Sequence, residues 1–222
     1  MYKEAVMQYY LFDLDGTLTD SKEGIAKGFK YALQHFDIII ENLDDLNKCV
    51  GPPLGASFKN FFALDDTQAE HAIAKYREYY TDKGMLENTV YEGIADVLEM
   101  LQQQGKTLFV ATSKPTVYAK QIVEHFGLSK YFTEVVGSEL DGTRSKKVDI
   151  INYILEKHNI TDLSEVVMIG DREYDIIGAN EVGVTSIGVL YGYGTFEELQ
   201  TAEATYIVES VEHLTIVLRM NF

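Results

Sequence analysis

The sequence has few of the features that mark secreted or membrane-spanning proteins. Its single cysteine, Cys49, excludes an intramolecular disulfide and a thiolate metal cluster, so we expect it to fill a packing position in a reducing compartment. There is no run of about 18 apolar residues, the length a membrane-spanning helix requires. The N-terminal residues lack the long apolar segment and small-residue cleavage site of a secretory signal, and we therefore expect a cytoplasmic protein.

Basic residues are scarce relative to acidic ones. With 19 lysines and arginines against 35 aspartates and glutamates, the formal net charge at pH 7 is −16. This charge opposes nonspecific attraction to nucleic acid and to anionic membranes, because both need basic patches that neutralise phosphates. We therefore expect neither as a partner. An anionic substrate would need a bound cation, a lysine or helix N-termini to receive it.

The length and the hydrophobic content are sufficient for a substantial core. The chain has 222 residues, of which 46% are hydrophobic, enough for one large or two smaller domains. Internal repeats, low-complexity tracts and long glycine or proline linkers are missing, so a second domain must be an insertion with short connections. Between residues 18 and 85 apolar residues such as Ile25, Phe29 and Phe36 recur at helical spacing, and we find no convincing strand there.

From Tyr91 onward, helical stripes alternate with short apolar strands. After the first apolar run at residues 9–12, strands are predicted at 106–112, 165–170, 184–189 and 204–209. Strands that alternate with helices imply right-handed crossovers and a mostly parallel sheet. The fold class is therefore α/β, a Rossmann-like parallel sheet with helices on both faces.

The change in pattern also predicts the domain organisation. We expect an α/β core domain at residues 1–17 and 86–222, and an inserted all-helical domain at residues 18–85.

Polar residues that could bind a ligand or take part in catalysis lie at the predicted strand ends, where ligands of parallel sheets bind. They are Asp13 and Asp15 after the first strand, Thr112 and Ser113 after the second, Lys146 and Lys147 at a helix start, and Asp171 with Asp175 after a later strand. Each has an ordinary explanation by itself, as a turn residue, a helix cap or a solvated lysine. Their convergence on one rim of one sheet favours a common site.

These residue types indicate magnesium and phosphate chemistry. Three or more neighbouring carboxylates repel one another unless a cation lies among them, and oxygen-only ligands suit Mg²⁺. Asp171 and Asp175 are four residues apart, so on a helix they share a face. The one nearer the metal would bind it, and the other would orient the metal-binding residue. A metal and a lysine would let one aspartate attack phosphorus, while a second aspartate carries the proton for the leaving oxygen.

The four motifs in this order resemble the haloacid dehalogenase superfamily. They are DLDGT at 13–17, the strand that ends in Thr112-Ser113, the lysine at 146 or 147, and GDREYD at 170–175. The resemblance covers nearly the whole chain. LTDS after the first motif, VGPPL at 50–54 and GVLYGYGT at 188–195 resemble the phosphoglycolate phosphatase-like branch. Membership of that branch implies a helical cap of the C1 type, inserted directly after the first motif.

The resemblance also implies a role for each aspartate. Asp13 would be the nucleophile, and Asp15 the general acid and base, with the Asp15 backbone carbonyl as a further magnesium ligand. Asp171 would bind the metal and Asp175 would support it, so the implied magnesium site consists of Asp13, Asp15, Asp171 and Asp175.

Three further residues would hold the transferring phosphoryl group. By the same resemblance these are the Thr112 hydroxyl, the Ser113 backbone amide and a catalytic lysine. The lysine is Lys147 if the position is counted back from the following helical stripe, and Lys146 if the loop is one residue shorter. We favour Lys147.

These implications define an expected function. We expect a Mg²⁺-dependent phosphatase, phosphoglycolate phosphatase-like, that hydrolyses a small phosphorylated metabolite through an aspartyl-phosphate intermediate. Alternatives are a 5'-nucleotidase, a sugar-phosphate mutase that resembles β-phosphoglucomutase, and a signalling protein like a phospho-aspartate receiver. The acid at Asp15 and the inserted cap weigh against the receiver. We expect a monomer or a homodimer.

Overall fold

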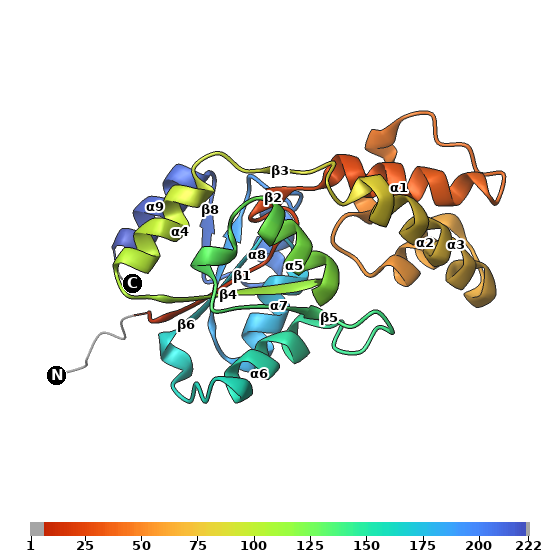
Figure 1. The fold of residues 1–222 in the computed structure, drawn as a ribbon. Coiled ribbons are helices and arrows are strands. Elements are labelled where there is room, and N and C mark those ends of the chain that lie inside the picture. The colour runs from red at the N-terminus through yellow and green to blue at the C-terminus, as the bar shows by residue number, and fades with distance from the viewer. Residues whose placement is uncertain (1–6, 221–222) are drawn as a thin grey trace. The chain divides into compact units, whose positions relative to one another are not determined.

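The computed structural model describes residues 7–220, and it divides the chain into two compact units (Figure 1). Met1–Thr19 together with Val90–Phe222 form the core unit, and Asp20–Thr89 form the insert unit. The sequence pattern placed the two boundaries after residues 17 and 85. Within residues 7–220, no helix is both long enough and apolar enough to cross a membrane.

The core unit contains a six-stranded sheet in which all neighbouring strands are parallel, as the alternating pattern predicted. Its strands, in spatial order, are β5 (Glu134–Ser138), β4 (Thr107–Pro115), β1 (Tyr9–Phe12), β6 (Val166–Gly170), β7 (Thr185–Val189) and β8 (Tyr206–Val208). The strand order changes direction at β1, which lies between β4 and β6. A crevice at the carboxyl ends of such strands is where ligands of open α/β sheets bind.

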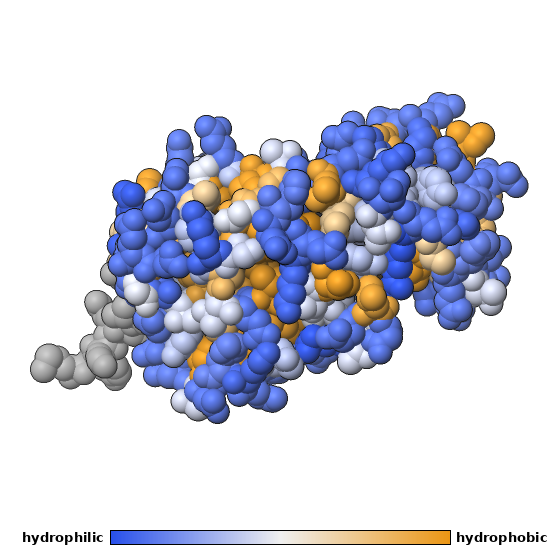
Figure 2. All heavy atoms as spheres, in the orientation of Figure 1, coloured by the Kyte–Doolittle hydropathy of each residue, from blue (hydrophilic) through white to orange (hydrophobic). Residues whose placement is uncertain are grey.

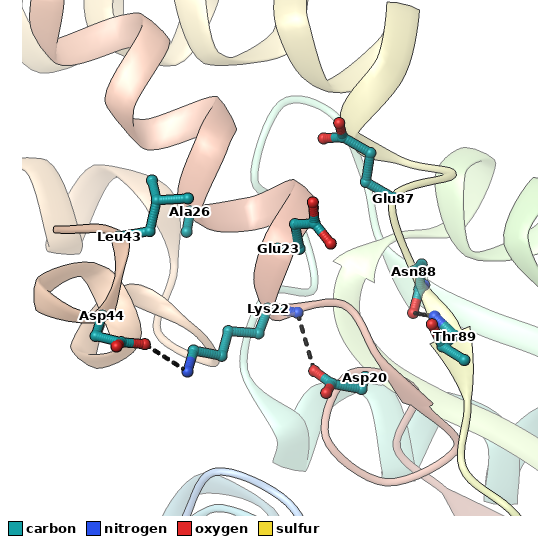
Figure 3. Close-up of a pocket in the computed structure, with 9 residues that line it drawn as sticks. All are labelled: Asp20, Lys22, Glu23, Ala26, Leu43, Asp44, Glu87, Asn88 and Thr89. Atoms are coloured by element: carbon teal, nitrogen blue, oxygen red, sulfur yellow. Dashed lines mark hydrogen bonds and ion pairs between the residues drawn. The ribbon is translucent and has the colours of Figure 1, made fainter.

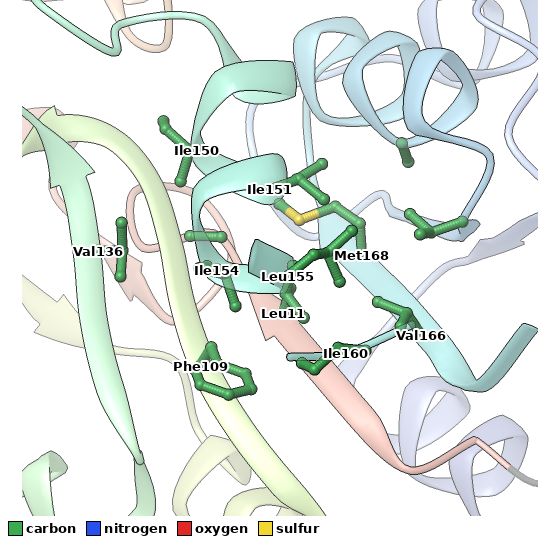
Figure 4. Close-up of a cluster of buried hydrophobic side chains, with 13 residues drawn as sticks. Leu11, Phe109, Val136, Ile150, Ile151, Ile154, Leu155, Ile160, Val166 and Met168 are labelled. Carbon is green, nitrogen blue, oxygen red and sulfur yellow. The ribbon is translucent and has the colours of Figure 1, made fainter. Parts of the chain in front are cut away.

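Alternate side chains of the central strands pack on opposite faces of this sheet. On one face Leu11, Phe109 and Met168 contact buried residues of α6 (Lys147–Lys157) and α7 (Glu173–Val182), as Figure 4 shows. Tyr10 and Phe12 point to the other face and are also almost fully buried. Both faces are therefore covered. The other helical segments of the unit are α4 (Ile94–Gln103), α5 (Thr116–His125), η3 (Ser129–Tyr131), η4 (Leu163–Glu165), α8 (Phe196–Thr201) and α9 (Val211–Arg219).

The insert unit is built almost entirely of helices around an aromatic core. Phe29 lies 4.7 Å from Phe58 and 5.2 Å from Tyr76, measured between ring centroids. Cys49 is buried, 2% exposed, in the packing position expected of it. The helical segments are α1 (Lys22–Gln34), η1 (Leu43–Cys49), α2 (Leu54–Phe62), α3 (Asp66–Tyr79) and the π-helical turn η2 (Tyr80–Gly84).

Two kinds of strand were not predicted from the sequence pattern. No strand was expected between residues 18 and 85, but β2 (Thr19–Asp20) lies there and pairs with β3 (Thr89–Val90), and two residues are too few to show any periodicity. The strand β5 was not predicted either, because its five residues contain only two large apolar side chains, Val135 and Val136.

On the face of the molecule shown in Figure 2, hydrophilic residues predominate, with hydrophobic residues exposed between them.

Candidate active site

The first acidic motif forms a tight turn at the carboxyl end of β1. The amide of Asp13 donates to the carbonyl of Ile169, 2.9 Å away, which continues the pairing of β1 with β6 by one residue. The Asp13 carboxylate accepts a hydrogen bond from the amide of Leu14 at 2.7 Å. Gly16 has φ +79°, and a side chain there would collide with the Asp171 carboxylate. Only glycine satisfies both the turn and this close approach.

Lys147 lies at the centre of the site. It is the first residue of α6, and its side chain is 2% exposed. Its ammonium nitrogen lies 3.1 Å from Asp13 Oδ1, 2.6 Å from Asp175 Oδ1 and 2.8 Å from the carbonyl oxygen of Ala111 at the end of β4. These three acceptors match the three N–H donors of a lysine ammonium. The neighbouring Lys146 is exposed, so the structure brings Lys147 and not Lys146 to the acidic motifs.

Asp171 and Asp175 come from the end of β6 and the first turn of α7. The buried Asp171 accepts hydrogen bonds from the amide of Tyr193 at 2.8 Å and from the hydroxyl of Thr17 at 3.3 Å. Asp175 uses one oxygen for Lys147 and the other to accept from the amide of Arg172 at 3.1 Å. Asp175 therefore links Lys147 to the turn after β6, and its role as the supporting acid stays a prediction.

The electrostatics of the cluster strongly disfavour three bare carboxylates. Burial raises the pKa of Asp13 to about 6, although Lys147 acts in the opposite direction. Burial, followed by the charges of Asp175 and Asp13, raises the pKa of Asp171 well above its ordinary range. Burial would lower the pKa of Lys147, but the charges of Asp13 and Asp175 outweigh it and raise that pKa above its usual value. One lysine among three acids leaves an excess of negative charge.

This arrangement fits a divalent cation. Asp13, Asp171 and Asp175 each offer a carboxylate oxygen, and the three oxygens lie within 4.8 Å of one another. Hard oxygen donors with no sulfur or nitrogen among them are the ligands that Mg²⁺ prefers. The Asp15 carboxylate is not part of this group, and the contribution of the Asp15 backbone carbonyl stays a prediction.

Asp15 belongs to a second, separate ion pair. Its Oδ2 lies 2.8 Å from the ammonium of Lys114, and the two side chains are 14% and 7% exposed. From the sequence alone, Lys114 is expected to be a solvated surface lysine, and this expectation is wrong, because its side chain is nearly buried and paired with Asp15. The signal available was its place at a strand end, directly after two residues already assigned to the site.

The irregular end of β4 positions Thr112 and Ser113. Here β4 advances from Ala111 to Pro115 while the paired β5 advances only from Val136 to Ser138, a bulge that redirects side chains. The buried Thr112 hydrogen-bonds through its side chain to Asp13. Ser113 accepts a hydrogen bond from the Ser138 hydroxyl on its carbonyl, at 2.9 Å. The structure therefore places Thr112 beside Asp13, and the phosphate-binding role of the Ser113 amide stays a prediction.

A separate pocket of about 270 Å³ lies within the insert unit and is lined by none of the predicted site residues (Figure 3). Its wall carries the acids Asp20, Glu23, Asp44 and Glu87. Lys22, which also lines it, is paired with Asp44 at 2.8 Å. An acidic wall is unsuited to a phosphate, so we place the candidate active site at the sheet and not in this pocket.

Comparisons with known proteins find several relatives of this chain. A family model described as haloacid dehalogenase-like hydrolase matches residues 10–189. A 5'-nucleotidase of Pseudomonas aeruginosa is 40% identical over 99% of this chain and 100% of its own length. The tyrosine-protein kinase PtkA of Mycobacterium tuberculosis is 36% identical over 91% of this chain and 69% of its own length. A phosphoglycolate phosphatase of Aliivibrio fischeri is 30% identical over 94% of this chain and 95% of its own length.

A solved structure gives the same result for the fold. The crystal structure of a predicted phosphatase from Clostridium acetobutylicum is 53% identical to this chain, covers 97% of it and 99% of its own chain, and has a TM-score of 0.94.

Proposed function

The chain belongs to the haloacid dehalogenase-like hydrolases, and we propose that this phosphatase of the family hydrolyses phosphate monoesters of small metabolites with Mg²⁺ through an aspartyl phosphate. The observation that carries the proposal is the buried Lys147, which bridges Asp13 at the end of β1 and Asp175 on α7. A buried ammonium of this kind keeps a carboxylate anionic and attracts a phosphate to it, because it supplies positive charge where solvent cannot.

In the first step, an oxygen of the Asp13 carboxylate attacks phosphorus and the bond from phosphorus to the ester oxygen breaks. Asp15 donates a proton to that leaving oxygen, so the organic product departs as an alcohol. Lys114, 2.8 Å from Asp15, orients the carboxyl group. The Thr112 hydroxyl, which bonds Asp13 in the free protein, is placed to hold an oxygen of the transferring phosphoryl group.

In the second step, water attacks the phosphorus of the aspartyl phosphate. Asp15 now accepts the proton from the water, and the bond from phosphorus to the Asp13 oxygen breaks. Inorganic phosphate leaves and the Asp13 carboxylate is restored. Asp15 thus serves both steps from one position, two residues from the nucleophile.

Asp13, Asp171 and the Asp15 carbonyl would hold Mg²⁺, with Asp175 as the supporting acid. When bound, the metal supplies positive charge that offsets the negative charge of the phosphate and of the acidic cluster.

For the substrate, we propose nucleoside 5'-monophosphates ahead of phosphoglycolate. The relative named as a 5'-nucleotidase is 40% identical over its whole length, against 30% for the named phosphoglycolate phosphatase. A sugar-phosphate mutase remains the alternative that returns the phosphoryl group to substrate instead of water. Family membership favours these three activities, the 5'-nucleotidase, the phosphoglycolate phosphatase and the sugar-phosphate mutase, over a receiver-like signalling protein.

The test is phosphate release from nucleoside monophosphates, phosphoglycolate, sugar phosphates and phosphotyrosine, each with Mg²⁺ and with EDTA. Asp13→Asn serves as the blank, and Asp82→Asn is the matched control, because Asp82 is an exposed aspartate of the insert unit. We expect Mg²⁺-dependent release by the wild type and by the control only. Release from Asp13→Asn at the wild-type rate would refute the nucleophile, and conversion of a sugar phosphate to its isomer without release would identify a mutase.

A further inference from the structure

The segment after β7, Tyr191–Gly194, lies against both acidic turns of the site. A methyl group on Gly192 would collide with the backbone oxygen of Gly16 and with the side chain of Asp171. A methyl group on Gly194 would collide with the backbone oxygen of Asp171. The two glycines therefore allow the backbone to approach the acidic residues more closely than any side chain would permit.

This segment makes two hydrogen bonds toward the site. The backbone amide of Tyr193 donates to Asp171 Oδ2 at 2.8 Å, and the hydroxyl of Tyr191 donates to the carbonyl of Thr17 at 3.1 Å. Thr17 in turn donates through its own hydroxyl to Asp171 Oδ1 at 3.3 Å. The two oxygens of Asp171 are thus held from two sides, by the segment itself and by a turn that the segment holds.

The surroundings of Tyr191 keep its hydroxyl in place. Its ring packs edge-on against Tyr91, with 5.0 Å between the ring centroids. Burial raises the pKa of the Tyr191 phenol far above its ordinary value, so the group retains the proton that it donates to Thr17. This bond fixes the turn that carries Asp13 and Asp15, because Thr17 lies in that turn.

We propose that Tyr191–Gly194 is a positioning segment for metal binding, in which Tyr191, through Thr17, and the backbone amide of Tyr193 set the orientation of the Asp171 carboxylate. The proposal rests on the magnesium site of the proposed function. Tyr191 touches neither substrate nor metal in this scheme, so it is a positioning residue. Groups that hydrogen-bond to metal-binding carboxylates commonly alter metal affinity or activity by about 10- to 100-fold when they are replaced.

The test measures metal binding without turnover, by titration of the apoprotein with Mn²⁺ and electron paramagnetic resonance detection of the free ion. Tyr191→Phe removes only the hydroxyl, and we expect Mn²⁺ to bind about 10-fold more weakly. Gly192→Ala displaces the backbone from Asp171, and we expect a loss nearer to 100-fold. In a phosphatase assay Tyr191→Phe should lower kcat with little change in KM, because the substrate contacts remain.

Two matched controls carry the same chemical changes elsewhere. Tyr174→Phe removes the hydroxyl of a tyrosine that is 39% exposed on α7, and Gly55→Ala places a methyl group in ordinary contact with Ile73, 3.6 Å away. Both should bind Mn²⁺ as the wild type does. Because Gly192→Ala can fail to fold, circular dichroism is recorded for each variant, and Tyr191→Phe alone then decides.

Each outcome has a distinct meaning. Weaker Mn²⁺ binding by folded Tyr191→Phe, with unchanged controls, supports the positioning role. Wild-type affinity in Tyr191→Phe overturns it while leaving the metal site intact. Failure of the wild type itself to bind Mn²⁺ overturns the proposed metal site, and the positioning role falls with it.

Discussion

Replacement of Asp171 by asparagine should stabilise the metal-free protein while it abolishes the proposed activity. The change keeps the shape of the side chain and removes its charge. The asparagine oxygen can still accept from the amide of Tyr193, and its NH₂ group can donate to Thr17, whose hydroxyl can accept as readily as it donates. No hydrogen bond of the buried group is lost, so the electrostatic change dominates.

The magnitude follows from the spacing of the cluster. The carboxylate oxygens of Asp13, Asp171 and Asp175 lie within 4.8 Å of one another. Two unit charges at that separation repel by roughly 3.5 kcal/mol at an effective dielectric constant of about 20. The wild type avoids part of this cost by binding a proton, so we expect Asp171→Asn to raise the free energy of unfolding in EDTA by about 2 kcal/mol. For a chain of this size that corresponds to an increase in Tm of about 4–8 °C.

The pH dependence has a defined sign. The pKa of Asp171 is raised in the folded protein, so between the ordinary value of 3.8 and the raised value the folded state binds more protons than the unfolded state. The stability of the wild type therefore falls as pH rises through that window, while asparagine does not titrate. The advantage of Asp171→Asn should grow with pH across the window and vanish below it.

The assay is thermal or urea unfolding of both proteins in EDTA and in Mg²⁺. A bound metal stabilises only the state that binds it, so Mg²⁺ should raise the Tm of the wild type and leave Asp171→Asn almost unchanged. Asp82→Asn, exposed and outside the cluster, should behave as the wild type in both buffers. A lower Tm for Asp171→Asn in EDTA, or an equal Mg²⁺ shift in both proteins, would refute the electrostatic reasoning.

Three further outcomes are expected. Lys147→Met leaves the carboxylates of Asp13 and Asp175 without their cation, so it should lower the free energy of unfolding by about 3–5 kcal/mol in urea titrations. Lys146→Met, at an exposed position, should match the wild type. Burial raises the pKa of the Cys49 thiol to about 12, so iodoacetamide at pH 8 should label it only after unfolding, and rapid labelling of the native protein would contradict its buried position. Partial burial raises the pKa of Glu134, but its contacts with Lys157 and His158 outweigh burial and lower that pKa below its ordinary 4.5. The ion pairs of Glu134 with Lys157 and His158 therefore stabilise the fold above pH 4.5 and lose their effect as pH falls through the lowered pKa. Glu134→Gln should cost less than about 1 kcal/mol at pH 7, and the cost should disappear once the pH is below the lowered pKa.

The fold was predictable because its signals are local. Apolar stripes at helical spacing and short apolar strands determine which segments form helices and which enter the sheet, and they gave the parallel α/β class correctly. Strands as short as β2 (Thr19–Asp20) carry no such signal, and β5 (Glu134–Ser138) carries little, which is why both were missed.

The site was predictable in its members more than in its contacts. Asp13, Thr112 and Asp171 were identified because parallel strands bring their carboxyl ends to one edge, so residues distant in sequence gather there. The sequence favoured Lys147 but left Lys146 open, and the structure brings Lys147 to the acids, since one residue of helix register decides which ammonium is buried.

The sequence by itself determined the motifs, their order and the sheet that gathers them, because these depend on residue type and on periodicity along the chain. Only the tertiary structure decided that Lys114 pairs with Asp15, and that Thr17 and the amide of Tyr193 hold Asp171. Thr17 and Asp171 are 154 residues apart, and their contact depends on how two loops fold against each other. Local patterns do not encode a contact of that kind, because it is set by packing and by the close approach of backbone that the glycines allow.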